Sequence, residues 1–430
     1  MPSQITRRHF IMSSAAAVSG LALSKERSFA RSYAANGKLN IGCVGVAGQG
    51  GYDLSNVTSE NIVALCDVDD NNLAGAAKNL SSARTYNDFR KMMEQKDIEA
   101  VVCATPDHMH AAVACATLKS GRHVYCEKPL AHSVWEIRQI RDLAKKHKRV
   151  TQMGTQIHAG NNYRRVVELV KSGAIGKVKE AHNWVGGGYC GEDRDRATKD
   201  IPSSLHYDLL IGPAPERPYS PGFLPFWWRG WWDFGGGTLS DMACHHMDLS
   251  YWALDLKNPL TVEAEGPPVH PEYCPRWLIV KYTYPARGDM PPVNLTWYNG
   301  DKRPHYFAEG ALPNWGNGTL FVGEKGMLLA DYDRHVLLPE KDFADFKRPE
   351  PFIPNSIGHH KEWIEACKSG GETTCNFDYS GALAEAVLLG NVSYRSGQKI
   401  EWDAKRLKCK GSPDADKWLK ETHREGWGLS

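Results

Sequence analysis

Apolar runs alternate with helical patterns from residue 39 to residue 153, and this alternation constrains the fold more than any other feature of the chain. The expected strands are five short runs, at residues 39–46, 62–68, 100–104, 123–126 and 150–153. Helical patterns lie between them, and the pattern over residues 134–146 starts with the capping box Ser133-x-x-Glu136. Strands that alternate with such helices form a parallel sheet with right-handed crossovers. The sequence therefore predicts an α/β domain in this part of the chain.

A glycine-rich turn, Gly45-Val46-Ala47-Gly48-Gln49-Gly50, follows the first expected strand and opens a helix. In that context a Gly-x-Gly-x-x-Gly turn places the pyrophosphate of a dinucleotide at the helix N-terminus. Ala47 takes the place of the middle glycine, which slightly restricts how closely the backbone can approach a pyrophosphate. Such turns are common, so the motif alone is a weak signal. The residues expected to contact the cofactor here are Gly45, Ala47, Gly48, Gln49 and Gly50.

Asp67 strengthens the dinucleotide prediction, because it ends the next strand 17 residues after Gly50. A carboxylate in this place accepts hydrogen bonds from a ribose diol and repels a 2′-phosphate. Residues 68–70, Val-Asp-Asp, supply no arginine or lysine that could bind such a phosphate. We therefore expect NAD rather than NADP. The alternative role for Asp67 is that of a turn or helix-cap aspartate.

A proline turn, residues 105–110, follows the third expected strand, at the edge where ligands bind in open parallel sheets. A turn that only starts a helix explains much of this segment equally well. The residues of the turn that we expect to contact the cofactor are Thr105, Pro106, His108 and His110.

A second turn, Tyr125-Cys126-Glu127-Lys128-Pro129, stands at the end of the fourth expected strand. Pro129 fixes the path by which the chain leaves, so we expect Lys128 to be aimed at the cleft. A surface lysine beside a proline turn is the alternative. Glu127, Lys128 and the later Gln156 complete the expected cofactor contacts.

The character of the sequence changes after about residue 155. A helix is expected at residues 161–171, and a glycine-, proline- and tryptophan-rich stretch at 186–234 is long enough that we expect it to cover a site or an interface. The expected strands of a mostly antiparallel sheet are residues 178–185, 277–284, 293–298, 319–322 and 326–329, and further helices are expected at 359–368 and 381–389. We divide the chain into a leader at 1–34, a dinucleotide-binding domain at 35–155 and a second α/β domain at 156–430.

A second cluster of chemistry-bearing residues runs from Gly235 to Asp248. If a helix begins near Ser240, Asp241 and His245 stand one turn apart on the same face, with Asp248 one turn further. A carboxylate beside an imidazole orients the ring and raises its pKa, which would give a positioned general base. The alternative is a capped helix with a core histidine.

A zinc site is conceivable from Asp241, His245, His246 and Asp248. Hydride transfer to nicotinamide needs no metal, however, and we predict none. His246 points about 100° away from its neighbour on a helix, which suits a structural role.

Four tryptophans, Trp227, Trp228, Trp231 and Trp232, surround Arg229 in the long stretch. Aromatic faces stack on sugar rings, yet they equally build cores and subunit contacts. We expect packing or an interface for most of them. His359 and His360, at the start of a late helix, are a further candidate pair for lining the cleft.

The first residues include Arg7 and Arg8 ahead of an apolar, small-residue run at 13–23. This pattern resembles a twin-arginine export signal, and the run is too short to span a bilayer. An ordinary charged N-terminal helix is the alternative. The expected partner is the twin-arginine export machinery, and the expected location is the periplasm or another compartment reached by the twin-arginine route.

Charge and cysteine content exclude other classes of function. The 52 basic and 50 acidic residues give a net charge of +2 without a long basic run, so no nucleic-acid partner is expected. Eleven cysteines are scattered without a Cys-x-x-Cys pair or the spacing of a zinc site. Cys43, Cys66 and Cys103 lie in strand-like runs and are expected to be buried free thiols.

Together these motifs resemble the Gfo/Idh/MocA oxidoreductase family over nearly the whole chain beyond the leader. The resemblance is carried by residues 124–129, by the glycine-rich segment that leads to Asp241, His245 and Asp248, and by the turn at 105–108. It implies a Rossmann domain followed by an α/β domain whose open, mostly antiparallel sheet forms homo-oligomer contacts. By the same resemblance, Lys128 matches the family's Glu-Lys-Pro lysine, and Asp241 and His245 match the residues that act with it.

The expected reaction is hydride transfer from a carbinol carbon of a sugar, polyol or glycoside to NAD. In it His245 takes the hydroxyl proton, Asp241 orients the imidazole, and Lys128 binds the reacting oxygen. Export favours a cofactor that is loaded beforehand and recycled on the enzyme. The alternatives are an NAD-dependent glycoside hydrolase, acting by transient oxidation and elimination, and a non-catalytic Rossmann-type binding protein.

Overall fold

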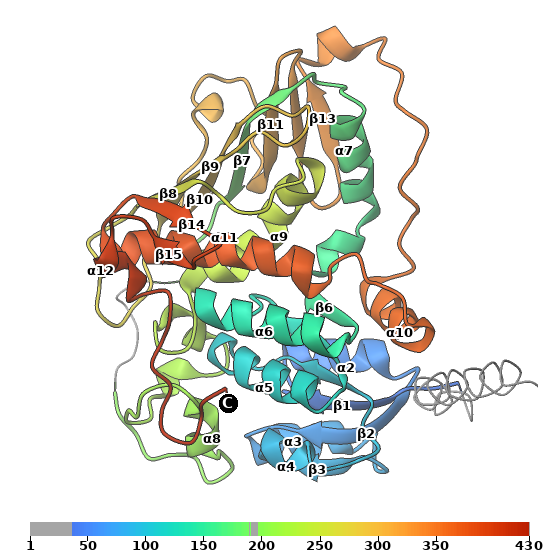
Figure 1. The fold of residues 1–430 in the computed structure, drawn as a ribbon, viewed down its shortest axis with the longest axis vertical. Coiled ribbons are helices and arrows are strands. Elements are labelled where there is room, and N and C mark those ends of the chain that lie inside the picture. The colour runs from blue at the N-terminus through green and yellow to red at the C-terminus, as the bar shows by residue number, and fades with distance from the viewer. Residues whose placement is uncertain (1–36, 189, 191–196, 430) are drawn as a thin grey trace, which may run out of the picture.

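The computed structural model describes residues 37–188, 190 and 197–429. The expected export signal lies outside the described residues. Two sheets organise the rest of the chain, one with six strands and one with nine (Figure 1). Within the described part, none of the helices has both the length and the apolar character needed to cross a membrane.

The six-stranded sheet is parallel and has the order β3-β2-β1-β4-β5-β6, the strand order of a doubly wound dinucleotide-binding fold. Its strands are β1 (Asn40–Val44), β2 (Asn61–Cys66), β3 (Arg84–Tyr86), β4 (Ala100–Cys103), β5 (His123–Glu127) and β6 (Thr151–Gly154). Sequence reasoning missed β3, because this three-residue edge strand carries no apolar run. The strand order reverses between β1 and β4, so a crevice is expected at their carboxyl ends.

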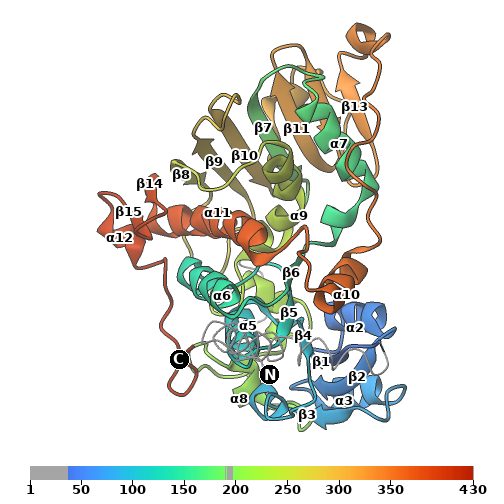
Figure 2. The same ribbon diagram turned by 45° about the vertical axis from the view of Figure 1, so that its right-hand side comes forward.

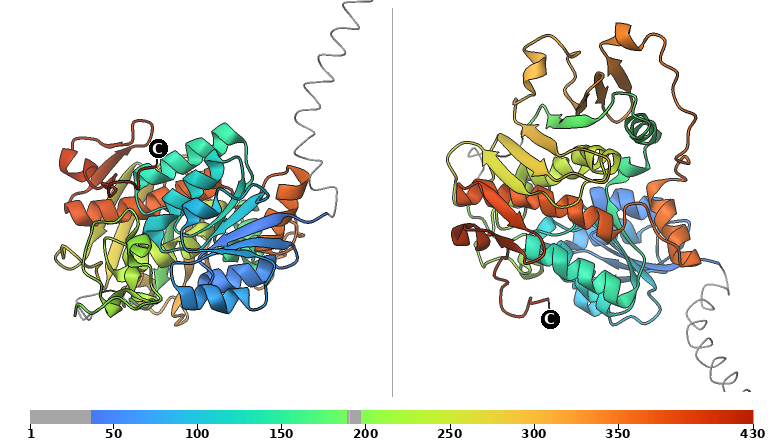
Figure 3. Two further views of the ribbon diagram at one scale, coloured as in Figure 1. Left: turned by 90° about the horizontal axis from the view of Figure 1, so that it is seen from below. Right: turned by 45° about the horizontal axis from the view of Figure 1, so that its top comes forward.

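Helices cover both faces of this sheet (Figure 3). They are α2 (Gln49–Val57), α3 (Asp70–Ala77), α4 (Phe89–Met92), α5 (Asp107–Lys119) and α6 (Val134–His147). One buried cluster lies under α5 and α6, and the other lies under α2 and α3. The expected capping box at the start of α6 is confirmed, since Ser133 and Glu136 each bind the backbone of the other.

The nine-stranded sheet has the order β13-β12-β11-β7-β10-β9-β8-β14-β15. Its strands are β7 (Val178–Val185), β8 (Thr261–Glu265), β9 (Leu278–Tyr284), β10 (Val293–Asn299), β11 (Asn317–Gly323), β12 (Met327–Ala330), β13 (His335–Leu338), β14 (Ile400–Asp403) and β15 (Lys408–Cys409). Strands β7 and β10 pair in parallel, whereas the other pairs described are antiparallel. The predicted fold class, a Rossmann domain plus a mostly antiparallel α/β domain, is confirmed.

Helices α7 (Asn161–Lys171), α9 (Gly237–Ala253) and α11 (Phe377–Ser396) accompany the second sheet. Helix α11 lies between that sheet and α6, so it joins the two halves of the molecule (Figure 2). Helix α10 (His359–Ser369) returns to the first half and packs on α2. Cys43, Cys66 and Cys103 are buried free thiols, which confirms the expectation for the strand cysteines.

Candidate functional site

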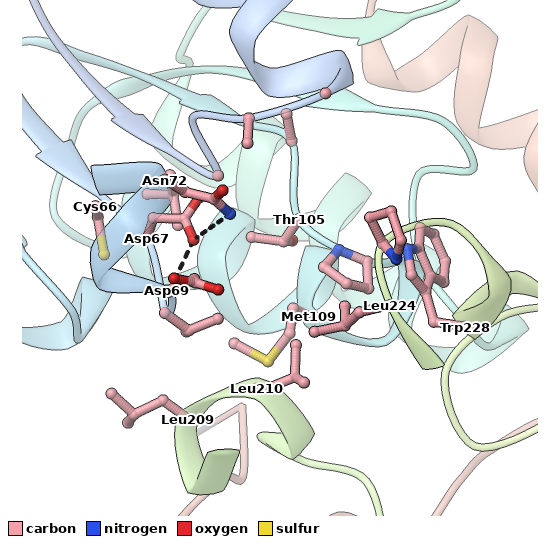
Figure 4. Close-up of a pocket in the computed structure, with 18 of the residues that line it drawn as sticks. Cys66, Asp67, Asp69, Asn72, Thr105, Met109, Leu209, Leu210, Leu224 and Trp228 are labelled. Carbon is pink, nitrogen blue, oxygen red and sulfur yellow. Dashed lines mark hydrogen bonds between the residues drawn. The ribbon is translucent and has the colours of Figure 1, made fainter. Parts of the chain in front are cut away.

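A cavity of about 430 Å³ follows the carboxyl ends of β1, β2, β4 and β5 (Figure 4). Its opposite wall comes from the long stretch at 186–234, through helix α8 (Tyr207–Ile211) and the short helix η4 (Trp227–Gly230). The expectation that this stretch covers a site is therefore confirmed. The cavity is lined by nine of the residues expected to contact a cofactor: Gly45, Ala47, Gly48, Gln49, Asp67, Thr105, Pro106, Glu127 and Lys128.

The glycine-rich turn has the geometry that a dinucleotide requires. Gly45 has a φ of +79°, and a Cβ there would stand 2.5 Å from the carbonyl oxygen of Ala104. A Cβ on Gly50 would stand 2.2 Å from the carbonyl oxygen of Gly45, so the tight turn requires glycine at this position. Gly50 itself does not line the cavity. The turn points the N-terminus of α2 at the cavity, where backbone N–H groups suit a pyrophosphate. Exposed Ala47 and Gly48 line this edge.

Asp67 combines the two roles that the sequence left open. Its carboxylate accepts hydrogen bonds from the backbone N–H of Val46 and of Asp69, both at 3.0 Å, and from Asn72 Nδ2 at 3.3 Å. It therefore holds the glycine turn against the turn after β2, and it also lines the cavity. Burial raises the pKa of this carboxyl above its usual value. The position at the end of β2 suits a ribose diol.

The rim beside Asp67 is acidic, because Asp69 and Asp88 also line the cavity. Arg90, on α4, binds the Asp88 carboxylate through Nε and Nη2 at 3.0 and 2.7 Å. A 2′-phosphate would meet these carboxylates. The arrangement fits NAD.

Lys128 directly follows β5 and reaches helix α9 across the cavity. Its ammonium donates to the backbone carbonyl of Asp241 at 2.9 Å and forms an ion pair with the carboxylate of the same residue. Arg229 Nε, from η4, lies 3.0 Å from the same carboxylate oxygen. Although burial disfavours the charge of Lys128, the carboxylates of Asp241 and Glu127 raise its pKa above the usual value. The site thus holds a fixed ammonium at the end of the cavity away from Asp67.

His245 follows Asp241 by one turn of α9 and is partly exposed. Burial, and then the charge of Lys128, lower the pKa of His245 well below its usual value, and Asp241 opposes this only in part. The neighbouring carboxylate of Asp241 raises this pKa, as expected, but burial and the charge of Lys128 outweigh it, so the net shift is downward. The imidazole is therefore neutral at neutral pH and able to accept a proton.

Asp248 does not extend the row formed by Asp241 and His245. Its carboxylate lies 3.0 Å from His158 Nδ1 and accepts a hydrogen bond from the Tyr379 hydroxyl at 2.7 Å. His158 is buried and Tyr379 is partly buried, so Asp248 ties α9 to these neighbours rather than serving the cavity.

The other zinc candidate, His246, stacks on Tyr332 with ring centroids 4.9 Å apart. Among the described residues, the potential metal ligands that come together are Cys103, His110 and Cys126. Both ring nitrogens of His110 already face backbone carbonyls, which leaves this cluster without a nitrogen ligand.

Two histidines that were expected to touch the cofactor point into the protein instead. His110 Nδ1 lies 2.7 Å from the carbonyl oxygen of Pro129, and its Nε2 lies 2.8 Å from that of Thr105. His108 Nε2 lies 2.9 Å from the carbonyl oxygen of Leu210. We therefore assign both to holding the loops of the cavity rather than to contact with the cofactor.

Gln156 does not line the cavity itself but binds Glu127, which does. Its Nε2 donates to Glu127 Oε1 at 2.5 Å and to the Tyr125 hydroxyl at 3.0 Å. Gln49 Nε2 bridges Glu127 Oε1, at 3.4 Å, and Asp53 Oδ1, at 3.2 Å. The result is a buried pair of carboxyl groups behind Lys128.

Sequence reasoning missed Asp53, although it occupies the buried face of α2 together with Leu54 and Val57. Burial raises the pKa of Asp53 to about 7 and that of Glu127 well above its usual value. His360 Nε2, from α10, lies 2.9 Å from Asp53 Oδ1. This histidine thus joins α10 to α2.

His359 Nε2 binds the carbonyl oxygen of Met153 at 2.8 Å, so the late histidine pair holds α10 rather than lining the cleft. Of the four tryptophans, Trp231 and Trp232 are buried in the core. Trp228 lines the cavity with the Arg229 guanidinium 4.2 Å from its ring centroid. Packing is therefore the main role of the cluster, as expected.

Curated relatives match part of this chain. An inositol 2-dehydrogenase of Salmonella typhimurium is 30% identical over 154 residues, which are 34% of this chain and 45% of that protein. A levoglucosan dehydrogenase of Pseudarthrobacter phenanthrenivorans is 34% identical over 111 residues, 24% of this chain and 27% of that protein. An alpha-N-acetylgalactosaminidase of Shewanella oneidensis is 28% identical over 203 residues, 40% of this chain and 44% of that protein. The matched region thus spans less than half of each relative.

Solved structures share the fold. GenD2 from gentamicin A biosynthesis, solved with NAD, has a TM-score of 0.61 at 19% identity and covers 85% of this chain and 97% of its own. The WlbA dehydrogenase of Bordetella pertussis, solved with NADH and UDP-GlcNAcA, has a TM-score of 0.60 at 18% identity and covers 85% of this chain and 99% of its own.

Two family models account for most of the described chain. Residues 39–155 match the NAD-binding Rossmann fold of the Gfo/Idh/MocA oxidoreductase family. Residues 165–429 match the C-terminal alpha/beta domain of the same family. The cofactor expected from the glycine turn and Asp67 is therefore confirmed as NAD. The chain belongs to the Gfo/Idh/MocA oxidoreductase family.

Proposed function

We propose that this protein transfers a hydride between NAD and a carbinol carbon of a sugar, polyol or glycoside. The observation that carries the proposal is the fixed ammonium of Lys128, which lines the NAD cavity and is held by Asp241. The inositol 2-dehydrogenase and levoglucosan dehydrogenase among the relatives support this substrate class.

Each residue of the site has a distinct task in this proposal. Bound nicotinamide supplies the acceptor for the hydride. Lys128 donates a hydrogen bond to the reacting oxygen, and neutral His245 accepts the hydroxyl proton as the carbonyl forms. Asp241 holds Lys128 in place and balances the charge of its ammonium, and the same carboxylate also binds Arg229.

The proposal extends to location and assembly. The leader at residues 1–34 directs the folded, NAD-loaded protein through the twin-arginine machinery to the periplasm. There the cofactor stays bound and is reoxidised on the enzyme by a second substrate. The open nine-stranded sheet forms the contact of a homo-oligomer.

Purification of the exported protein tests this directly. NAD should co-purify with it, and sugars or polyols should reduce the bound NAD, as followed by the absorbance of reduced nicotinamide. Absence of both bound and bindable NAD, or no reduction by a broad panel of sugars, polyols and glycosides, would contradict the proposal.

NAD-dependent glycoside hydrolysis is the second candidate, favoured by the 28% identity to an alpha-N-acetylgalactosaminidase. In this reaction a hydroxyl is oxidised transiently to a ketone, the aglycone is eliminated, water adds to the unsaturated ketone that remains, and the hydride returns to the carbonyl carbon. Release of the aglycone from chromogenic glycosides without net accumulation of NADH would identify it. Net NADH formation or reduction of a second sugar would identify the oxidoreductase.

A further inference from the structure

The adenosine half of the cavity can be located from the dinucleotide motifs. The glycine turn marks the pyrophosphate and Asp67 marks the adenosine ribose. The adenine therefore lies beyond Asp67, on the side away from Lys128. The cavity wall there includes Phe89 of the Rossmann domain, but it also includes Leu209 and Trp427, which come from far later in the chain.

Leu209 reaches the cavity because helix α8 and the residues before it are bound to the turn after β2. The backbone N–H of Asp70 donates to the carbonyl of Ser204 at 2.9 Å, and that of His206 donates to the carbonyl of Val68 at 2.8 Å. These bonds surround the turn that Asp67 organises. Figure 4 shows Leu209 facing the cavity from α8, across from Asp67.

Trp427 reaches the cavity because the last residues of the chain are bound to α8. Arg424 donates from its backbone to the carbonyl of Pro213 at 2.9 Å and from Nε to that of Gly212 at 2.9 Å, and its guanidinium binds the Asp208 carboxylate at 2.5 Å. The C-terminus thus ends beside α8 and α5 (Figure 1).

Trp427 itself is 6% exposed. It packs against Phe89, with ring centroids 6.4 Å apart, and lies under the Arg90 guanidinium at 4.3 Å. A large ring held by α4 on one side and by the tail on the other forms a fixed apolar wall beside the acidic rim.

The tail is anchored before it reaches α8. His132 Nδ1 lies 2.7 Å from a carboxylate oxygen of Glu421, and His423 Nε2 lies 2.8 Å from a carboxylate oxygen of Glu136 at the start of α6. Both contacts join the tail to the Rossmann half of the molecule.

We propose that residues 204–211 and 421–429 form an adenosine clasp, in which Leu209 and Trp427 contact the adenine and slow the release of NAD. Segments from outside the Rossmann domain then enclose the cofactor. Without them, the Rossmann domain would leave the adenosine end of the cofactor open. The clasp rests on the proposed function. Recycling of NAD on the enzyme requires that NAD stay bound between turnovers, and the clasp would keep it bound.

The test compares NAD release from the full chain and its variants. The amount of NAD that stays bound is measured after desalting. The rate at which bound NAD dissociates is measured by exchange with labelled NAD. Trp427→Ala and Leu209→Ala should release NAD at least about tenfold faster, because each loses apolar contact with the adenine. Trp277→Ala is the matched control, since Trp277 also lies under a cation at 4.3 Å, from Lys302, but is not among the residues that line the cavity.

ADP-ribose separates the clasp from effects at the nicotinamide end. Its Kd should rise in Trp427→Ala by the same factor as the Kd for NAD, and it should stay unchanged in Trp277→Ala. Unchanged NAD release and ADP-ribose affinity in a folded Trp427→Ala protein would overturn the clasp. If that variant fails to fold, Leu209→Ala decides by the same two measurements.

The two proposals fail in different ways. If the unmodified protein loses its NAD on desalting, internal recycling is wrong, and the contacts to adenine are then judged from the Kd values for added NAD and ADP-ribose. If the unmodified protein retains NAD and both clasp variants retain it equally well, the clasp is wrong and recycling stands.

Discussion

Lys128 and Asp241 stand 113 residues apart in the chain, yet the ammonium of one binds both the carboxylate and the backbone carbonyl of the other. Lys128 directly follows a strand of the Rossmann sheet, and Asp241 lies in the helix that packs on the second sheet. Neither half of the molecule holds the pair alone. The site therefore exists only where α9 meets the carboxyl ends of the parallel strands.

Lys128→Ala should lower turnover by about a thousandfold and leave NAD bound. The variant loses the donor to the reacting oxygen, and removal of such a donor typically lowers turnover by about a hundred- to a thousandfold. The adenosine half of the cavity is untouched, so the amount of bound NAD should match that of the unmodified protein. The measurement is turnover on any substrate that reduces bound NAD. Full turnover in the variant would show that Lys128 has no role in the chemistry.

His245→Gln removes the proposed proton acceptor. The pH dependence of turnover in the unmodified protein should show whether His245 has this role. Because burial and Lys128 depress the pKa of His245, the ring stays neutral as the pH falls through the ordinary histidine pKa of about 6.5. Turnover in the oxidation direction should therefore hardly decline between pH 8 and pH 6. A steep acid limb centred near pH 6.5 that His245→Gln removes would contradict the lowered pKa of His245, and full turnover in His245→Gln would contradict its role as the proton acceptor.

The sequence predicted the central strands of both sheets because each is a compact apolar run. It missed β3 and β8, in segments with exposed charged residues such as Arg84 and Glu263, and it also missed β13, β14 and β15 toward the ends of the second sheet. Short pairing strands of this kind depend on a neighbouring strand, which a single sequence does not show. The predictions of a Rossmann domain and of the α/β class did not require these strands.

The candidate site was predictable where a motif carries it, as for Lys128 and Asp67. It was not predictable where a contact joins distant segments. Asp53 looks like an ordinary helix residue until Glu127 and His360 are placed beside it. Trp427 gave no signal in the sequence, because only the folded tail brings it to the cavity.

Asp67→Ala should weaken both the fold and the binding of NAD. The backbone N–H groups of Val46 and Asp69 lose their acceptor, and a buried donor without a partner costs about 1–3 kcal/mol. Thermal unfolding should show this loss in the protein without cofactor, and the Kd for NAD should rise by about tenfold or more. The variant should still reject NADP, because Asp69 and Asp88 remain on the rim. An NADP affinity equal to that for NAD would show that Asp67 alone sets the preference.

The tail should loosen as the pH rises, and the release of NAD should accelerate with it. Although burial disfavours the charge of His132, the Glu421 carboxylate, with Glu136 and Asp107, raises its pKa to about 9. The usual value is about 6.5. A histidine whose pKa is raised by folding stabilises the folded state fully below the unfolded pKa and loses this effect as the pH rises through the folded pKa. The bond to Glu136 raises the pKa of His423 in the same direction.

NAD release from the unmodified protein should therefore be slowest near pH 6.5 and should speed up toward pH 9.5. Glu421→Gln removes the carboxylate that holds the charge on His132, so its release should be faster at neutral pH and should depend less on pH. Lys417→Ala is a control for charge in the same region, since Lys417 contacts Trp418 rather than a tail carboxylate. A release rate that does not change with pH in the unmodified protein would show that the His132–Glu421 contact does not hold the clasp closed.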